Sequence, residues 1–103
     1  MAYGLCGKIL AVEGEGDTLE RYLLEAAAAL AEVDGCTLYA VSRLPGEPGA
    51  VWVIEIWSDR EAHQDSLQLD AVQDVISRAR PVIAGMGDRF ELSPVGGKGL
   101  QLP

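Results

Sequence analysis

Short apolar runs occur at four places along the chain and predict four β-strands. They span residues 3–13, 36–43, 50–57 and 88–93. The third run is the clearest, because it is rich in the β-branched and aromatic residues that strands favour. The second and third runs are separated by residues 44–49, which hold two prolines and two glycines. Such a short turn indicates an antiparallel hairpin. The last run alternates apolar and polar residues, which is typical of an edge strand.

An amphipathic helix is predicted between the first two strands. Apolar residues recur there at steps of three and four, from Leu19 to Val33, which places them on one helical face. Asp17 followed by Glu20 is typical of a capping box at the start of a helix. Gly35 is expected to end the helix in the left-handed conformation.

Two further helical segments are predicted between the third and fourth strands. The spacing of Ser58 and Glu61 indicates a second capping box, and a break is expected near residues 68–70. A longer helix follows, with an apolar face that reaches Ile83 and a bend or an end at Pro81. The Gly-Met-Gly segment at 85–87 is expected to close it.

The resulting β-α-β-β-α-β order predicts an α+β, ferredoxin-like sandwich with an antiparallel sheet and the helices on one face. The third strand carries apolar side chains in both alternating sets, Val51 and Val53 in one and Trp52, Ile54 and Ile56 in the other. Helices on one side cover only one of these sets. The other is expected to pack against a second copy of the sheet, which makes the protein a homodimer.

Length and charge narrow the class of protein. The 103 residues suffice for one domain, assigned to residues 1–95, with 96–103 as a flexible tail. The net charge of −8 argues against nucleic acid and against an anionic membrane surface as partners. No apolar run approaches the roughly 20 residues of a membrane span, and the N-terminus lacks the pattern of a signal peptide. A cytoplasmic location is therefore expected.

The cysteines do not indicate a disulfide or a metal site. Cys6 and Cys36 each lie in an apolar strand, so both are expected to be reduced and buried. Two cysteines and one histidine at these spacings match no common ligand pattern, so no metal is expected.

Two residues around the third strand are candidates for acid–base chemistry. His63 is the only histidine, and an imidazole early in the following helix could accept a phenolic proton as general base. The alternative is a histidine on the protein surface. Glu55 stands in an otherwise apolar strand and could be a pocket acid or base. The alternative for Glu55 is a carboxylate on a sheet edge or in an ion pair, for instance with Arg43 across the hairpin.

Three more residues are candidates for substrate binding. Trp57 shares a strand face with Glu55 and either forms a flat wall for an aromatic ligand or packs on Ala62. Tyr39 could hydrogen-bond a ligand oxygen or be only half-buried. Ser66 lies one helical turn after His63, so both could face the same pocket.

The stretch Ile54-Glu-Ile-Trp-Ser-Asp-Arg-Glu-Ala-His63, which runs on to Ser66 and Leu67, resembles the antibiotic biosynthesis monooxygenase family, and within it the quinol monooxygenases. Residues 34–39 and 79–83 are similar to that family too, and the resemblance extends over about residues 3–95. It implies a dimeric α/β barrel of ferredoxin-like subunits.

The resemblance also implies an activity: oxidation of a small phenol, quinol or polyketide aromatic by O2, with no flavin, haem or metal cofactor. Trp57 and His63 match the family motif, whereas many members have a histidine where Ser66 stands. Relatives that degrade haem carry an asparagine in the first strand and a histidine late in the last helix. This sequence has neither, so no haem is expected.

Two other functions remain open at this point. The chain could be a non-catalytic, stress-response type of module that holds a small hydrophobic ligand. It could also be a polyketide cyclase or isomerase on the same dimeric barrel, which needs acid–base groups but no O2. One fold hosts many activities, so the fold does not separate them.

Overall fold

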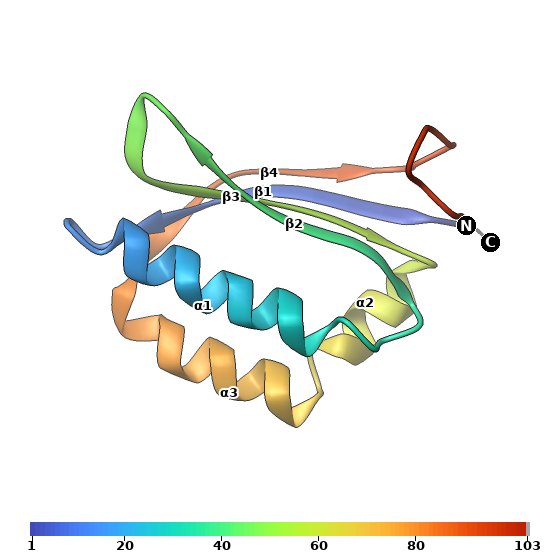
Figure 1. The fold of residues 1–103 in the computed structure, drawn as a ribbon, viewed down its shortest axis with the longest axis horizontal. Helices are drawn as coiled ribbons and strands as arrows, with labels where there is room; N and C mark the ends of the chain where they lie inside the picture. Colours follow the sequence, from blue (N-terminus) through green and yellow to red (C-terminus); the bar gives the residue numbers. More distant parts are fainter. Residues whose placement is uncertain (103) are drawn as a thin grey trace.

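The computed structural model describes residues 1–102 and shows a four-stranded sheet with all helices on one face (Figure 1). The element order confirms the predicted fold class, with the second helical region divided in two. The elements are β1 (Tyr3–Ala11), α1 (Gly16–Ala29), β2 (Cys36–Leu44), β3 (Glu47–Trp57), α2 (Arg60–Ser66), α3 (Asp70–Ala79), the 3₁₀ turn η1 (Arg80–Val82) and β4 (Ile83–Leu92).

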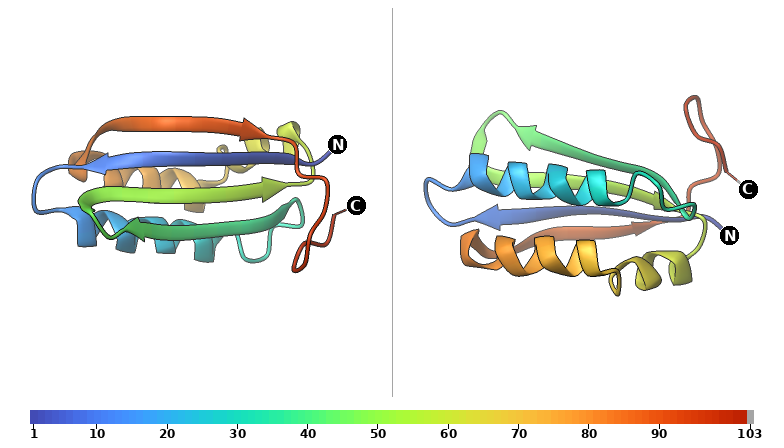
Figure 2. Two further views of the ribbon diagram at one scale, coloured as in Figure 1. Left: turned by 90° about the horizontal axis from the view of Figure 1, so that it is seen from above. Right: turned by 60° about the horizontal axis from the view of Figure 1, so that its bottom comes forward.

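The sheet has the order β2-β3-β1-β4, and every neighbouring pair is antiparallel. β1 is therefore central, with Leu5 opposite Glu55 on β3 and Glu91 on β4. Figure 2 shows α1 and α3 side by side beneath the sheet, with α2 near one end of them. Residues that are paired across strands point to the same face, so this register fixes which side chains meet under the sheet.

The core lies between the sheet and the helices, as the predicted apolar faces require. One cluster surrounds Trp57 and Leu30 at the α2 end, and another surrounds Leu19 and Val51 at the opposite end. Trp57, Leu19 and Val51 are fully buried.

Both predicted helix caps are wrong. α1 begins at Gly16 after Glu15, with no side-chain cap, so Asp17 lies inside the first turn. Its carboxylate pairs with Arg43 at 2.9 Å. α2 is capped by Asp59, whose Oδ1 accepts a hydrogen bond from the Ala62 N–H at 2.7 Å. Ser58 still belongs to the strand exit, since its N–H donates to the Gly35 carbonyl at 2.8 Å.

Gly35 does not end α1 in the left-handed conformation, contrary to the prediction. α1 already ends at Ala29, and Gly35 does not have a positive φ. The position needs glycine because of space: a Cβ there would lie 2.8 Å from the Cβ of Ala62. Gly35 therefore lets α2 approach the start of β2 closely.

The fourth strand begins earlier than predicted, at Ile83. Pro81 does end the regular helix, because it sits in η1 directly after α3. The chain then joins the edge of β1, where the Val82 carbonyl accepts a hydrogen bond from the Val12 N–H at 2.8 Å. The segment 85–87 is therefore strand rather than a helix terminator, and Met86 pairs with Ile9. The hairpin turn is also shorter than predicted, only residues 45–46.

Cys6 and Cys36 are free thiols and are partly rather than fully buried, which corrects their predicted burial. After β4, residues 93–102 contain no helix or strand, and Gly99 and Gln101 lie near Cys36. Within residues 1–102, no helix is both long and apolar enough to cross a membrane.

Candidate functional site

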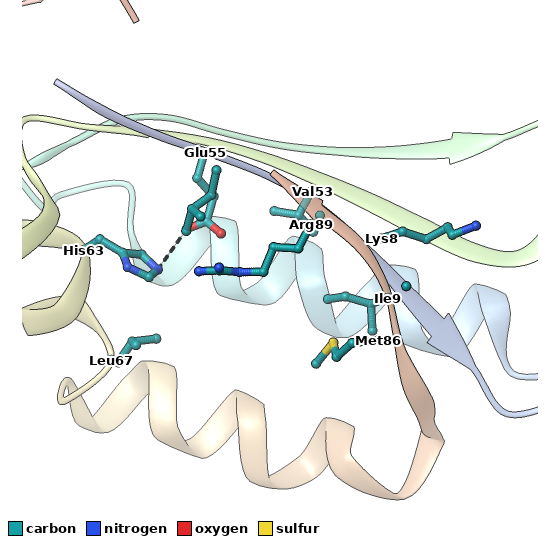
Figure 3. Close-up of a pocket in the computed structure, with 11 residues that line it drawn as sticks. Lys8, Ile9, Val53, Glu55, His63, Leu67, Met86 and Arg89 are labelled. Atoms are coloured by element: carbon teal, nitrogen blue, oxygen red, sulfur yellow. Dashed lines mark ion pairs between the residues drawn. The ribbon is translucent and has the colours of Figure 1, made fainter. Parts of the chain in front are cut away.

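A cavity of about 380 Å³ lies between the inner face of the sheet and α2 (Figure 3). Most of its lining is apolar, and a few polar groups converge on it, which is the usual make-up of a small-molecule site. The lining residues are Leu5, Gly7, Lys8, Ile9, Val53, Glu55, His63, Leu67, Met86, Gly87 and Arg89.

The floor of the cavity is open because β1 has a glycine at its centre. Gly7 lies opposite Val53 on β3 and Arg89 on β4. A Cβ at Gly7 would meet no atom closer than the Arg89 Cγ at 3.9 Å. The missing side chain between Leu5 and Ile9 therefore provides part of the space for a ligand.

His63 is the fourth residue of α2, and neighbours on several sides hold it in place. The Ser66 hydroxyl donates a hydrogen bond to the His63 carbonyl at 2.6 Å. The imidazole packs between the rings of Tyr3 and Trp57, with ring centroids 5.7 and 5.6 Å away. These contacts fix the direction in which the imidazole enters the cavity.

The start of α2 is tied to the sheet through Glu91 on β4. The Glu91 carboxylate accepts a hydrogen bond from the Tyr3 hydroxyl at 2.6 Å and pairs with Arg60 at 2.7 Å. The Arg60 guanidinium also lies over the Tyr3 ring, 4.8 Å from its centroid. β1, β4 and α2 thus meet in one polar cluster directly beside His63.

Glu55 is the carboxylate that faces His63. Its Oε1 accepts a hydrogen bond from the Trp57 Nε1–H at 3.0 Å and lies 3.8 Å from the His63 Nε2. The side chains of Glu55 and His63 are only 17% and 14% exposed. Burial raises the pKa of Glu55, and Trp57, His63 and Arg89 partly oppose that rise. The site thus combines an imidazole with a carboxylate that holds a proton more tightly than usual.

The five predicted site residues occupy different places. His63 and Glu55 line the cavity. Trp57 is fully buried behind them and packs near Ala62, the alternative considered above. Ser66 is buried too and faces the His63 carbonyl and a separate pocket beside Leu69. Tyr39 lies opposite Glu55 and is partly buried in the core, where burial raises its pKa.

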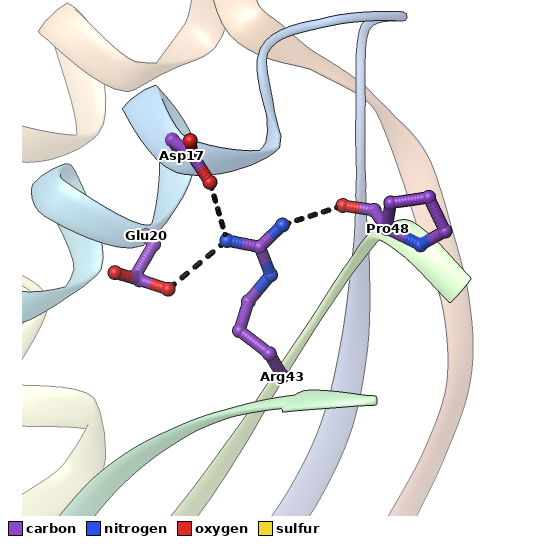
Figure 4. Close-up of polar contacts among 4 residues, drawn as sticks. All are labelled: Asp17, Glu20, Arg43 and Pro48. Atoms are coloured by element: carbon purple, nitrogen blue, oxygen red, sulfur yellow. Dashed lines mark hydrogen bonds and ion pairs between the residues drawn. The ribbon is translucent and has the colours of Figure 1, made fainter. Parts of the chain in front are cut away.

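The alternative of an Arg43–Glu55 ion pair is wrong. The hairpin register places Tyr39 opposite Glu55 and Arg43 opposite Val51. Arg43 instead pairs with Asp17 and Glu20 on α1, and it donates a hydrogen bond to the Pro48 carbonyl at 2.7 Å (Figure 4). Glu55 is therefore free of Arg43 and available to His63.

Sequence reasoning missed Arg89 and Gly7. Arg89 lies in the predicted alternating strand, and that alternation puts it on the same face as Glu91. Gly7 interrupts an apolar strand, which often marks space for a ligand or close approach of a backbone. Neither signal says which face is inner, so the cavity could not be located from them.

Within residues 1–102, no group of three or more histidine, cysteine, aspartate or glutamate side chains is arranged to hold a metal ion.

Comparisons with known proteins agree with this fold. The solved structure of a candidate antibiotic biosynthesis monooxygenase from Chloroflexus aurantiacus J-10-fl is 40% identical, with a TM-score of 0.90 over 98% of this chain and 100% of that chain. A candidate monooxygenase of the same type from Caulobacter crescentus CB15 is 22% identical, with a TM-score of 0.83 and coverage of 92% and 91%.

That likeness and the likeness to a third structure, both below 25% identity, show the fold alone. SnoaB, a cofactor-independent oxygenase from Streptomyces nogalater, is 13% identical, with a TM-score of 0.77 and coverage of 94% of this chain and 96% of that chain. None of the curated proteins matches the chain. The family model for antibiotic biosynthesis monooxygenases matches residues 3–78. Together with the relative at 40% identity, this match shows that the chain belongs to the antibiotic biosynthesis monooxygenase family.

Proposed function

We propose that this protein is a cofactor-independent monooxygenase that oxidises a small phenol, quinol or related aromatic with O2. The observation that supports this most directly is the His63–Glu55 pair at the wall of a largely apolar cavity. A base in such a cavity can ionise a hydroxyl group while the apolar lining limits the access of water.

The first step assigned to the protein is removal of a proton. The hydroxyl of the aromatic gives its proton to the His63 imidazole, and Glu55 stabilises the imidazolium that forms 3.8 Å away. The Trp57 N–H keeps Glu55 Oε1 oriented, so Trp57 acts as a positioning residue. Ser66 orients α2 by its bond to the His63 carbonyl, and Tyr39 supports the strand opposite Glu55.

The electrons come from the substrate. The phenolate reduces O2, one oxygen atom replaces a ring hydrogen and becomes a carbonyl, and the other leaves as water. A phenol plus O2 thus gives a quinone plus water. The protein supplies the base, the orientation and the apolar surroundings.

The test is oxygen uptake with a panel of hydroquinones and anthrones in metal-free buffer. We expect O2 consumption that depends on the protein, and a quinone that carries one atom from isotopically labelled O2. Uptake that persists after removal of the protein by filtration would mean spontaneous autoxidation. Binding of these aromatics without any O2 consumption would favour the alternative of a ligand-binding module.

A further inference from the structure

Arg89 is a cation at the cavity without a partner of its own. Across residues 1–102 its side chain makes no ion pair or hydrogen bond, whereas Lys8, the other cation of the lining, pairs with Glu47 at 3.0 Å. Glu55 and Glu91 interact with its charge electrostatically, but in the described part of the chain no direct partner occupies its N–H donors, so they are available to an anion.

Arg89 is exposed to solvent, and it also forms part of the lining of the cavity. The side chain extends from β4 toward His63 and Glu55, with Val53 and Ile9 nearby (Figure 3). Gly7 on the neighbouring strand adds no side chain that would obstruct it. Glu55 interacts with Arg89 electrostatically without forming an ion pair, since its Oε1 is engaged by Trp57 and lies near His63.

The charge of the whole protein makes this cation more significant. With a net charge of −8, the molecule as a whole repels anions, so an anionic ligand needs a local positive group. Arg89 supplies that group beside the proposed base. Its planar fork of N–H donors matches both oxygens of a carboxylate.

We propose that Arg89 binds a carboxylate of the substrate, so that the preferred substrates are small aromatic acids with the carboxylate beside the reacting hydroxyl. This inference rests on the proposed function, in which the reacting hydroxyl is the one that gives its proton to His63. We place the carboxylate beside the hydroxyl because the Arg89 side chain extends toward His63 in the same cavity (Figure 3). A cavity of about 150 Å³ holds one benzene ring, so about 380 Å³ has room for such an acid.

Binding without O2 tests the inference separately from catalysis. The probes are gentisate, a hydroquinone with a carboxylate beside one hydroxyl, and its uncharged amide, gentisamide. Under anaerobic conditions we expect wild-type protein to bind gentisate roughly tenfold more tightly, as for a charge-assisted hydrogen-bonded pair. The preference should shrink as salt is added.

Variants assign that preference to one residue. Arg89→Gln should bind both probes equally, and Arg89→Lys should restore part of the preference because it keeps the charge but not the fork. Arg21→Gln, at an exposed position on α1, changes the net charge equally and should behave as wild type. Circular dichroism checks that each variant is folded.

Two results would overturn the inference: equal affinity of the wild type for acid and amide, or an Arg89→Gln variant that weakens both probes by the same factor. A preference that depends on Arg89, together with no O2 consumption, would leave the ligand inference standing and remove the monooxygenase proposal.

Discussion

At the scale of single residues, His63 is positioned before any ligand binds. The rings of Tyr3 and Trp57 lie on it, and Glu55 faces its Nε2. An imidazole fixed in this way loses little freedom when it accepts a proton, which makes it the best candidate for the base.

Replacing the imidazole tests that assignment. His63→Ala should lower the rate of O2 uptake by about 10²–10⁴-fold, the usual contribution of general-base catalysis, while the fold survives. Gln64→Ala is the control, because Gln64 is the next residue of α2 and is exposed. Full activity of His63→Ala would move the role of base to Glu55 or to a water molecule in the cavity.

Glu55 links the site to the pH dependence of stability. Burial raises its pKa above the ordinary value of 4.5, so the folded state holds the proton more tightly than the unfolded state does. The folded protein therefore loses stability as pH rises from the unfolded pKa through the folded one, and the loss is complete above both.

The free energy of unfolding of Glu55→Gln should then be higher than that of the wild type at pH 8 and nearly equal to it at pH 4. Glutamine has no charge to bury, and its side-chain carbonyl can still accept the hydrogen bond from the Trp57 N–H. Urea unfolding at both pH values measures this. Glu32→Gln, at an exposed site on the turn after α1, controls for net charge. A Glu55→Gln variant that is less stable at pH 8 would mean that the carboxylate stabilises the fold.

The residue scale also shows how far a sequence can predict a site. Glu55 stood out as an acid in an apolar strand and His63 as the only histidine, and both line the cavity. The sequence did not show whether Trp57 lines a pocket or packs in the core, because an aromatic side chain on the inner face of the sheet suits both roles. Arg89 was missed because its importance depends on which partners it lacks, and only the three-dimensional arrangement shows that.

At the scale of elements, α2 carries the site, and a glycine controls its approach. A Cβ at residue 35 would lie 2.8 Å from Ala62 Cβ and 3.4 Å from the Ser58 Oγ. α2 has only seven residues, so it would have to move as a unit and would take His63 with it.

Gly35→Ala should destabilise the fold by about 1–3 kcal/mol, the usual cost of overpacking, and weaken the binding of cavity ligands. Ala62→Gly in the same chain restores the space at a helix cost of about 1 kcal/mol. The double variant should therefore recover binding and part of the stability in a double-mutant cycle. Independent, additive effects of the two changes would refute the proposed contact.

The element scale explains which predictions succeeded. Strand and helix order follow from hydrophobic periodicity, which records burial directly. The caps failed because both helices begin at other residues than predicted. α1 begins at Gly16, so Asp17 lies inside its first turn and pairs with Arg43. α2 begins at Arg60 after Asp59, and the backbone N–H of Ser58 is bonded to the Gly35 carbonyl. β4 begins earlier than predicted because the backbone from Ile83 onward pairs with β1. The sequence of that segment alone does not show that it will pair with a strand far away in the chain.

At the scale of the whole molecule, one face of the sheet has no helix over it (Figures 1 and 2). Cys6 lies opposite Ile54 and Phe90, so these three side chains form an apolar row on that outer face. Ile54 and Phe90 are 37% and 53% exposed, and Leu92 is 51% exposed. An apolar row of this kind is a typical interface between identical subunits.

We propose that two copies pair through this outer face, as the doubled apolar pattern of β3 predicts. Ile54→Asp would place a charge from each subunit in the interface, and leaving such charges unpaired there costs several kcal/mol. The wild type should therefore sediment as a dimer at micromolar concentration and the variant as a monomer. The matched control is Ile76→Asp on α3, because Ile76 is 36% exposed against 37% for Ile54.

The Cys6 thiol gives an independent readout, since it lies in the same row and should react faster with a thiol reagent in Ile54→Asp than in the wild type. A wild type that stays monomeric at micromolar concentration, with Cys6 equally reactive in both proteins, would show that the outer face is free and that any second copy binds elsewhere.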